Sequence, residues 1–363
     1  MQFRDLHRQY EALKAEMDEA MLRVAASGAY IMGPQVAELE QQLATYVGMK
    51  HCISSANGTD ALWLALRALG LKAGDAVFVP DFTFFSTAEA PAILDLVPVF
   101  VDVDARTFNM DVNDLERKWQ QACNNGLHPA AVIAVDLFGR PADYDAIVDF
   151  CRSKRLPLIE DGAQGFGGSI RGKRACSFGD IATTSFFPAK PLGCYGDGGA
   201  LFTNDDRYAD LLRSLRVHGK GTDKYDNVRL GLNSRLDTLQ AAILQVKMRH
   251  FDDELKAVNR VAAKYNSLLS GKVIIPEIPD GIVSSWAQYT IQAPNRDELQ
   301  ARLKAAGVPA MVYYPHTMSR QSAFAHLNQA PCPVADRLSR TVLSLPMHPY
   351  MTDEEIETVA SLI

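Results

Sequence analysis

Seven short apolar runs alternate with helix-like stretches between residues 52 and 203, and this alternation constrains the fold more than any other feature of the 363-residue chain. Strands separated by helices pair mainly in parallel, and the helices then cover both faces of the sheet. The sequence therefore predicts an α/β fold with a mainly parallel seven-stranded sheet. The predicted strands are residues 52–55, 76–80, 97–103, 130–138, 156–160, 181–187 and 200–203.

Helices are predicted on either side of this region. Tyr10, Leu13, Met17, Met21 and Val24 fall at intervals of three or four residues, which predicts one helix that ends at Gly28. Its apolar stripe is typical of a core or a dimer contact. A second and longer helix is expected over residues 235–269.

The last hundred residues predict a second, smaller domain. Strands are expected at 273–276, 286–293 and 309–314, with helices at 296–306 and 353–363, a mixture typical of an α+β domain. Because 363 residues are too many for one ordinary core, we expect a large domain over residues 1–250 and a small C-terminal domain over residues 251–363.

Charge and cysteine content exclude several classes of function. The net charge of −6 has no basic stripe, which argues against nucleic acid as a partner. The N-terminus is charged and no run of eighteen apolar residues follows, so we expect neither a signal peptide nor a membrane span, and a cytoplasmic location. The six cysteines lack metal-ligand spacing, which predicts reduced, packed thiols and no structural metal.

Lys190 and Asp161 are the residues that most strongly indicate a chemistry. Lys190 follows a predicted strand, and Asp161 follows the apolar run 156–159, at the end of a strand where ligands bind in open α/β sheets. A lysine that forms a Schiff base and a carboxylate beneath a pyridine nitrogen are the two groups that pyridoxal 5'-phosphate requires. The alternatives are a solvated surface lysine and an aspartate that caps a helix.

Residues for the rest of that cofactor can be identified by the same reasoning. Gly58 and Thr59 open a predicted helix directly after a strand, where backbone N–H groups bind phosphate, and the Ser185 hydroxyl adds to the same cradle. Phe84 follows another strand and is a candidate to lie against the pyridine ring, and Gln164 is a candidate hydrogen-bond donor to its phenolic oxygen. Each has an ordinary alternative: a helix cap, a core aromatic and a surface amide.

Four spaced motifs give the chain a family resemblance. They are Gly58-Thr59-Asp60-Ala61-Leu62, Asp161-Gly162-Ala163-Gln164, Ser185-Phe186-Phe187-Pro188-Ala189-Lys190 and Gly231-Leu232-Asn233-Ser234-Arg235-Leu236. With the ending Ser344-Leu345-Pro346-Met347-His348-Pro349, the sequence resembles the DegT/DnrJ/EryC1/StrS family of nucleotide-sugar aminotransferases from near one end to the other. The resemblance implies the fold-type I architecture of pyridoxal phosphate aminotransferases and a homodimer with shared active sites.

The resemblance also implies a role for each matching residue. Lys190 would be the Schiff-base lysine and the acid/base, and Asp161 would pair with the pyridinium nitrogen. Gln164 would contact the phenolic oxygen and Phe84 would stack on the ring. Gly58, Thr59 and Ser185 of one chain would bind the phosphate. Asn233 of the partner chain would complete the phosphate site.

A reaction follows from the same likeness. Relatives that dehydrate sugars carry histidine in place of Lys190, so the lysine favours transamination, with L-glutamate as the amino donor. The sequence around Lys190 resembles that of enzymes acting at C3, and the predicted substrate is UDP-2-acetamido-2-deoxy-3-oxo-glucuronate, on a route to lipopolysaccharide O-antigen. Arg235 and Tyr314 are then the predicted substrate-binding residues, although Arg235 would equally suit a helix cap or a dimer ion pair.

Two other functions remain open at this point. A C4 aminotransferase acting on a 4-keto-6-deoxy nucleotide sugar would share every cofactor residue, and a regulatory protein would bind the cofactor without turnover. Gly162 and Gly165 depart from the usual Ala and Ser of the family, which would loosen a local helix and remove a hydroxyl contact. His218 and His348 are expected to be packed, and residues 218–231 to form a mobile loop or to reach a partner.

Overall fold

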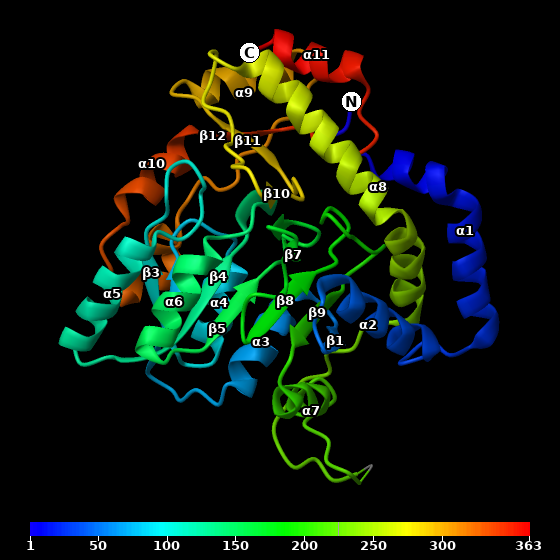
Figure 1. Cartoon of the computed structure of the whole chain (residues 1–363), viewed down its shortest axis with the longest axis vertical. Helices are drawn as coiled ribbons and strands as arrows, with labels where there is room; N and C mark the ends of the chain where they lie inside the picture. The colour runs from blue at the N-terminus through cyan, green and yellow to red at the C-terminus, as the bar shows by residue number, and fades with distance from the viewer. Residues whose placement is uncertain (224) are drawn as a thin grey trace.

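The computed structural model describes residues 1–223 and 225–363, and it confirms the predicted α/β architecture (Figure 1). Its main sheet has seven strands in the order β1-β9-β8-β5-β4-β2-β3 within the described residues. The strands are β1 His51–Ser55, β2 Asp75–Pro80, β3 Val97–Val101, β4 His128–Val135, β5 Leu158–Asp161, β8 Ile181–Ser185 and β9 Gly199–Thr203. All seven predicted strands are confirmed, with ends that shift by a few residues.

Strand β9 gives the sheet its mixed character. It pairs antiparallel with both β1 and β8, whereas β8, β5, β4, β2 and β3 pair in parallel. A parallel array needs a crossover between successive strands, and helices supply these crossovers. The helices of the described chain are α1 Leu6–Ser27, α2 Pro34–Val47, α3 Gly58–Ala68, α4 Ser86–Ile93, α5 Val112–Asn124, α6 Tyr144–Lys154, α7 Asp206–Leu215, α8 Thr238–Leu269, α9 Arg296–Ala305, α10 Pro333–Thr341 and α11 Asp353–Ser361.

Both faces of the sheet are buried, which explains why its strands are apolar throughout. Ile133 packs with α3, α4 and α7 on one face, while its neighbours Val132 and Ala134 pack with α5 and α6 on the other. At the opposite end of that second face, α1, α2 and α8 cover Cys52 and Phe202. The alternation of side chains along each strand therefore fills two apolar layers.

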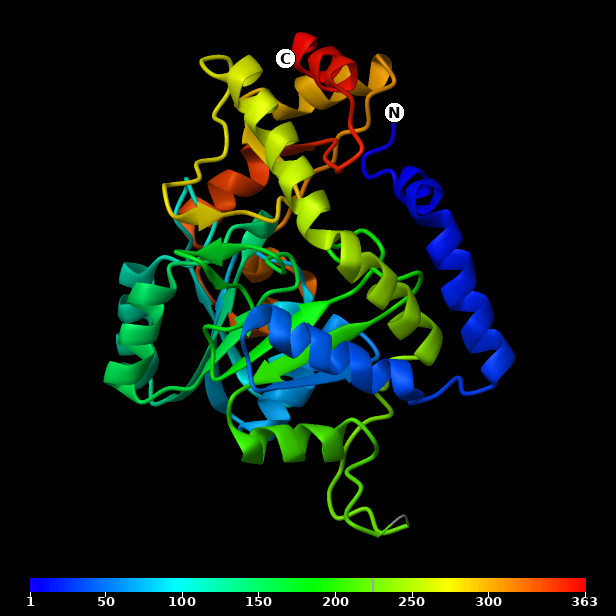
Figure 2. The same ribbon diagram turned by 45° about the vertical axis from the view of Figure 1, so that its right-hand side comes forward.

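Helix α8 connects the sheet to the small C-terminal region (Figure 2). Its first half packs in the apolar cluster that includes Phe251, and its second half, from Val258, packs with β11 Tyr289–Gln292, β12 Val342–Leu345, α9 and α11. Residue 250 lies inside this continuous helix. The division into residues 1–250 and 251–363 stays a prediction, and part of the second segment, from Met318 to Val342, packs on the large sheet.

Two predicted strands of the small region are wrong. Residues 273–276 and 309–314 make only isolated bridges, Ile274 with Gln292 and Met311 with Ser344. Proline at positions 276 and 309 removes a backbone donor from each segment, so neither extends its pairing. In this region β11 pairs instead with β12. Strand β12 follows α10 directly, so no turn residues in the sequence mark where it begins. A separate three-stranded sheet holds β10 Ile282–Val283, β6 Ser169–Ile170 and β7 Lys173–Arg174.

The two long predicted helices are confirmed. Helix α1 ends at Gly28, which adopts φ 67° as a left-handed C-cap, and its residues Leu13, Met17 and Val24 are buried. The apolar stripe therefore belongs to the core.

The polypeptide after α7 projects away from the sheet in Figures 1 and 2, and the predicted loop 218–231 lies here, with residue 224 outside the described residues. His218, predicted to be packed, is exposed, because the chain turns outward there with φ 58°.

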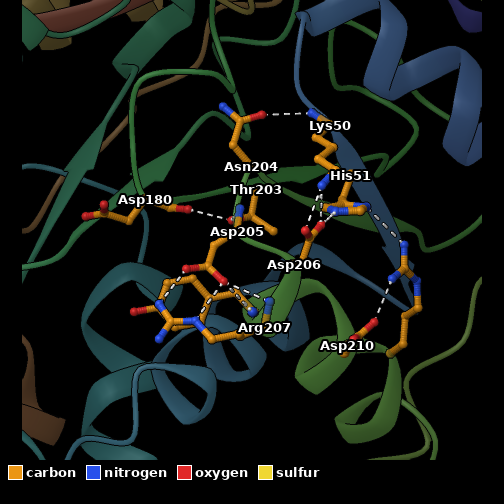
Figure 3. A network of polar contacts seen from close by, with 11 residues as sticks. Lys50, His51, Asp180, Thr203, Asn204, Asp205, Asp206, Arg207 and Asp210 are labelled. Carbon is orange, nitrogen blue, oxygen red and sulfur yellow. Dashed lines mark hydrogen bonds and ion pairs between the residues drawn. The ribbon is translucent and has the colours of Figure 1, made fainter.

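A polar network ties α7 to the edge of the sheet (Figure 3). Asp205 caps α7 by accepting hydrogen bonds from the backbone N–H groups of Arg207 and Tyr208. Asp206 accepts from Lys50 Nζ at 2.7 Å and contacts His51 Nε2 at 2.6 Å. These contacts join the start of β1 to the first residue of α7.

Candidate active site

Asp161 lies at the carboxyl end of β5, in the middle of the sheet. Its side chain is 6% exposed and accepts hydrogen bonds from Thr87 Oγ1 at 3.2 Å and from the Ala163 backbone N–H at 3.2 Å. Burial raises the pKa of this carboxyl, while the Ala163 hydrogen bond, the charge of Lys190 and the Thr87 hydrogen bond oppose the shift. Residues 163–167 form turns, so the alternative that Asp161 caps a helix is wrong, as is the expected helix around Gly162 and Gly165.

The two glycines of this turn are required by close packing. A Cβ at Gly162 would lie 2.4 Å from Cys176 Sγ, and a Cβ at Gly165 would lie 2.3 Å from Asp136 Oδ2. Neither distance is compatible with ordinary van der Waals contact. Glycine at these two positions therefore makes room for Cys176 and Asp136.

Lys190 lies in the loop between β8 and β9 and lines the same cavity as Asp161. The backbone N–H of Lys190 donates to Phe187 O at 2.8 Å, which closes a turn and directs the half-buried side chain into the cavity. Burial lowers the pKa of Lys190, the charge of Asp161 offsets part of this shift, and the charge of Arg4 adds to it. The arrangement gives an amine that loses its proton more readily than a solvent-exposed lysine does.

The first turn of α3 forms an anion cradle. Asn57 caps the helix by accepting from the Asp60 backbone N–H at 2.8 Å, and the N–H groups of Gly58 and Thr59 have no acceptor within the helix. A Cβ at Gly58 would lie 2.7 Å from Ser185 Cβ, so only glycine allows β8 to approach this closely. The Thr59 hydroxyl lies 2.7 Å from Ser86 Oγ, at the start of α4.

Gln164, Tyr314 and Phe84 form another wall. Gln164 Oε1 accepts from the Phe138 backbone N–H at 2.8 Å, and its Nε2 donates to the Tyr314 hydroxyl at 3.2 Å. The rings of Tyr314 and Phe84 are 6.1 Å apart, and Phe84 is 51% exposed. An exposed aromatic ring at the mouth of a cavity offers a flat apolar surface, so the core alternative for Phe84 is wrong.

These side chains surround one cavity of about 460 Å³. Eight of the ten predicted site residues line it: Gly58, Thr59, Phe84, Asp161, Gln164, Ser185, Lys190 and Tyr314. The other two, Asn233 and Arg235, lie on the segment between α7 and α8 and are not among its lining residues. Asn233 is exposed and Arg235 half-buried, so their action across a dimer stays a prediction.

Sequence reasoning missed several lining or supporting residues. Ser86 and Thr87 belong to the segment that drew attention to Phe84, and hydroxyls next to a candidate aromatic were the available signal. Gln288 and Tyr313 also line the cavity, from segments distant in sequence. No local sequence pattern identifies Gln288 or Tyr313.

His348 is 1% exposed, as predicted for a packed histidine, and burial lowers its pKa to about 4.

A family model described as the DegT/DnrJ/EryC1/StrS aminotransferase family matches residues 11–363. The chain belongs to this family. The match covers the sheet, the cavity and the C-terminal region together. The resemblance inferred from the four motifs is therefore confirmed, and the fold is that of the family's solved members.

Curated relatives in the DegT/DnrJ/EryC1/StrS family match over nearly the whole chain. UDP-2-acetamido-2-deoxy-3-oxo-D-glucuronate aminotransferase of Pseudomonas aeruginosa is 46% identical, covering 100% of this chain and 99% of that protein. A pleiotropic regulatory protein of Geobacillus stearothermophilus is 42% identical over 99% of this chain and 96% of its own. UDP-N-acetyl-3-dehydro-alpha-D-glucosamine 3-aminotransferase of Acidithiobacillus ferrooxidans is 40% identical over 99% of this chain and 96% of its own.

Two solved structures share the whole fold. A DegT/DnrJ/EryC1/StrS aminotransferase from Brucella abortus has a TM-score of 0.98 at 47% identity and covers 100% of this chain and 98% of its own. NtdA from Bacillus subtilis, solved with bound cofactor PMP, has a TM-score of 0.90 at 27% identity, over 99% of this chain and 85% of its own. Both fold into the architecture described above.

Proposed function

We propose that this chain is a pyridoxal 5'-phosphate aminotransferase that moves an amino group from L-glutamate to C3 of a keto nucleotide sugar. The proposed acceptor is UDP-2-acetamido-2-deoxy-3-oxo-glucuronate. The observation that carries the proposal is the single cavity in which Lys190, Asp161 and the N-terminus of α3 face one another. An amine, a buried carboxylate and an anion cradle correspond to the aldehyde, the ring nitrogen and the phosphate of that cofactor.

The described residues fit this cofactor chemically. Asp161 makes no ion pair with any described residue, so a protonated ring nitrogen would be the cation that keeps this buried carboxyl ionised. Gly58 lets a phosphate approach the free N–H groups of α3, where the helix dipole favours negative charge. The solved relative that holds PMP supports the same assignment. When bound, the cofactor supplies an electron sink for the charge left on a carbon that loses its proton.

The chain's own residues then move the proton. Lys190 Nζ faces the cavity with a lowered pKa, so it accepts a proton from the substrate carbon and returns it as an acid. Asp161 would hold the positive charge of the ring nitrogen in place. Tyr314 and Gln164 form a fixed wall through their hydrogen bond, and Phe84 covers the mouth of the cavity.

The choice of C3 rests on two relatives. Their names place an amino group at a 3-oxo or 3-dehydro carbon of a UDP-linked sugar. A glucuronate substrate also needs a cation for its carboxylate, and Lys190 is the sole basic side chain among the described residues that line the cavity. We assign that role to Arg235 of a second chain, with Asn233 beside it completing the phosphate site of a homodimer.

The six free cysteines, five of them buried, suit a cytoplasmic location, and an O-antigen route is the proposed destination.

A regulatory role is the second candidate, because one relative carries that name. A protein that only bound the cofactor would not need an amine placed for proton transfer.

An experiment distinguishes the enzymatic role from the regulatory role. Adding UDP-2-acetamido-3-amino-glucuronate should bleach the visible absorbance of the purified holoprotein, as its amino group passes to the cofactor. Bleaching by glutamate alone would move the assignment to a C4 sugar, and bleaching by neither would support the regulatory role.

A further inference from the structure

The residues before α1 connect two walls of the cavity. Phe3 O accepts from the Met347 backbone N–H at 3.0 Å, and the Phe3 ring packs edge-on against Tyr313 with ring centroids 6.1 Å apart. Tyr313 lines the cavity beside Tyr314. The next residue, Arg4, extends in the other direction to the loop that carries Lys190. Two consecutive residues therefore join the small C-terminal region to the catalytic loop.

Arg4 holds the backbone of that loop. Its Nη2 donates to Lys190 O at 2.9 Å and to Pro191 O at 3.3 Å. Hydrogen bonds from a guanidinium are stronger than neutral ones, and a planar donor that reaches two successive carbonyls restricts the rotation of the peptide between them. The direction in which the Lys190 side chain leaves the loop is thereby fixed.

The charge of Arg4 also acts on Lys190. Among the described residues no carboxylate pairs directly with Arg4. Glu254 is the acidic residue whose charge acts on Arg4, and it accepts hydrogen bonds from Gln9 and Tyr350. Burial lowers the pKa of Arg4 to about 10, so the group remains a cation at neutral pH. Its field therefore reaches Lys190 without a direct counter-charge.

The other charged and titratable groups here are few. Asp161 faces Lys190 and favours its protonated form. The groups that interact electrostatically with Arg4 are Lys247 and Glu254 of α8 and the buried His348, with Cys194 acting on Lys247 and Asp5 on His348. Burial lowers the pKa of Lys247 to about 8. Asp161 and Arg4 therefore act on the Lys190 amine in opposite senses.

We propose that Arg4 is a positioning residue for Lys190: it fixes the loop through two carbonyls, and its charge disfavours a second positive charge on Lys190 Nζ. This inference rests on the proposed function, because it assigns Arg4 a part in proton transfer by Lys190. The residue that touches the substrate remains Lys190. Arg4 acts through it, from a segment that ordinary reasoning about a chain terminus would regard as a tail.

Arg8 provides a matched control in the same segment. It lies one helical turn further on and donates to both carboxylate oxygens of Glu355, at 2.9 and 2.7 Å, and to Tyr350 O at 3.1 Å. None of its hydrogen bonds reaches the Lys190 loop. Arg8→Gln thus removes the same charge, and a comparable tether to the C-terminal region, without touching Lys190.

The first experiment uses the full chain without cofactor. The rate at which Lys190 is reductively methylated is measured by mass spectrometry across pH for the wild type, Arg4→Gln, Arg4→Lys and Arg8→Gln. We expect Arg4→Gln to shift the profile to higher pH, so that labelling below the midpoint slows about two- to tenfold. Arg4→Lys, which keeps the charge, and Arg8→Gln should follow the wild type. Identical profiles for all four chains would overturn the proposal.

The second experiment uses the holoprotein. Arg4→Gln should lower kcat about five- to twentyfold while KM for L-glutamate stays within about twofold, because the lost interaction concerns the proton-transfer step. Equal losses in Arg4→Gln and Arg8→Gln would show a purely structural tether and would contradict the inference. If the wild type itself transfers no amino group, the proposed function fails, and the labelling profile still decides whether Arg4 controls Lys190.

Discussion

At the scale of single residues, the site depends on two groups that shift each other's proton affinity. Burial drives the pKa of Lys190 down and that of Asp161 up, and the attraction between their charges opposes both shifts. Neither residue forms an ion pair within the described residues. A cationic ring nitrogen placed over Asp161 would satisfy the carboxyl and leave the amine free to act as a base.

Lys190→Ala should abolish transamination, with a loss of at least about a thousandfold, because positioned acid/base and nucleophilic groups contribute that much or more. The phosphate cradle is untouched, so the variant should still bind cofactor, though without its Schiff-base absorbance. Amino transfer from glutamate and the visible spectrum are the two measurements. A variant that turned over at the wild-type rate would remove Lys190 from the mechanism.

Gly58→Ala should weaken cofactor binding more than tenfold, since the new Cβ would lie 2.7 Å from Ser185 Cβ and would push β8 away from α3. Equilibrium binding of pyridoxal phosphate measures the effect. Unchanged binding in the single variant would show that the helix start does not contact the cofactor.

Site residues differ in how readily the sequence reveals them. Lys190, Asp161 and Gly58 follow strands of the sheet, where parallel topology brings chain segments to one edge, so their roles could be inferred from position and residue type. Gln288 and Arg4 could not, because each reaches the site by packing between distant segments. His218 was misjudged for a related reason: burial depends on where a loop points, and loop direction is not encoded by residue type.

At the scale of elements, the small C-terminal region is tied to α1 by an ion pair and a helix cap. Glu355 lies in the first turn of α11, where its side chain accepts from the Thr352 backbone N–H and Thr352 in turn caps its N–H. Both Glu355 oxygens also accept from Arg8. The Arg8 hydrogen bonds, with the cap and the charge of Arg8, lower the pKa of Glu355 to about 2.

This coupling predicts a pH-dependent stability. A carboxyl whose pKa is lower in the folded than in the unfolded state stabilises the fold above its ordinary pKa and loses that effect as the pH falls toward the folded value. The melting temperature of the wild type should exceed that of Glu355→Gln at pH 7, and the gap should narrow between about pH 5 and pH 2. A gap that stayed constant over this range would assign the difference to packing instead of to the charge.

The elements themselves were predicted unevenly, for a physical reason. Strands of the main sheet are buried on both faces, so they appear as continuous apolar runs between helices. In the small region a pair of strands, β11 and β12, suffices, and the adjoining segments at 274 and 311 contribute single bridges. Their apolar residues face α8, α9 and α11 without forming strands, and an apolar run alone does not distinguish these cases.

At the scale of the whole molecule, the cavity of one chain opens to the surface, and Lys190 is the sole basic side chain among the described residues that line it. Phe84 and Phe187 are 51% and 52% exposed at the cavity, and Asn233 lies on the segment that leaves the sheet after α7. Exposed aromatic side chains next to a binding site favour contact with another surface. If this segment reaches the site of a partner in a two-fold dimer, symmetry makes the contact reciprocal, so each chain completes the site of the other.

Mixing two inactive chains tests this arrangement. If Asn233 acts across the dimer, Asn233→Ala and Lys190→Ala homodimers should each be severely impaired, and exchange of subunits should restore one intact site in every hybrid. About a quarter of the wild-type activity is then expected from an equal mixture, since half of the dimers are hybrids with one of two sites intact. Differently tagged chains verify the exchange. Absence of recovery among verified hybrids would place Asn233 in the site of its own chain.

The transfer of nitrogen to C3 is the central claim, and isotopic labelling measures it most directly. The holoprotein is incubated with ¹⁵N-labelled L-glutamate and UDP-2-acetamido-2-deoxy-3-oxo-glucuronate, and the labelled position in the product sugar is determined by NMR. We predict the label on the nitrogen bonded to C3, with 2-oxoglutarate formed in equal amount. Label transfer only to a 4-keto-6-deoxy nucleotide sugar, or no transfer to any sugar, would contradict the claim.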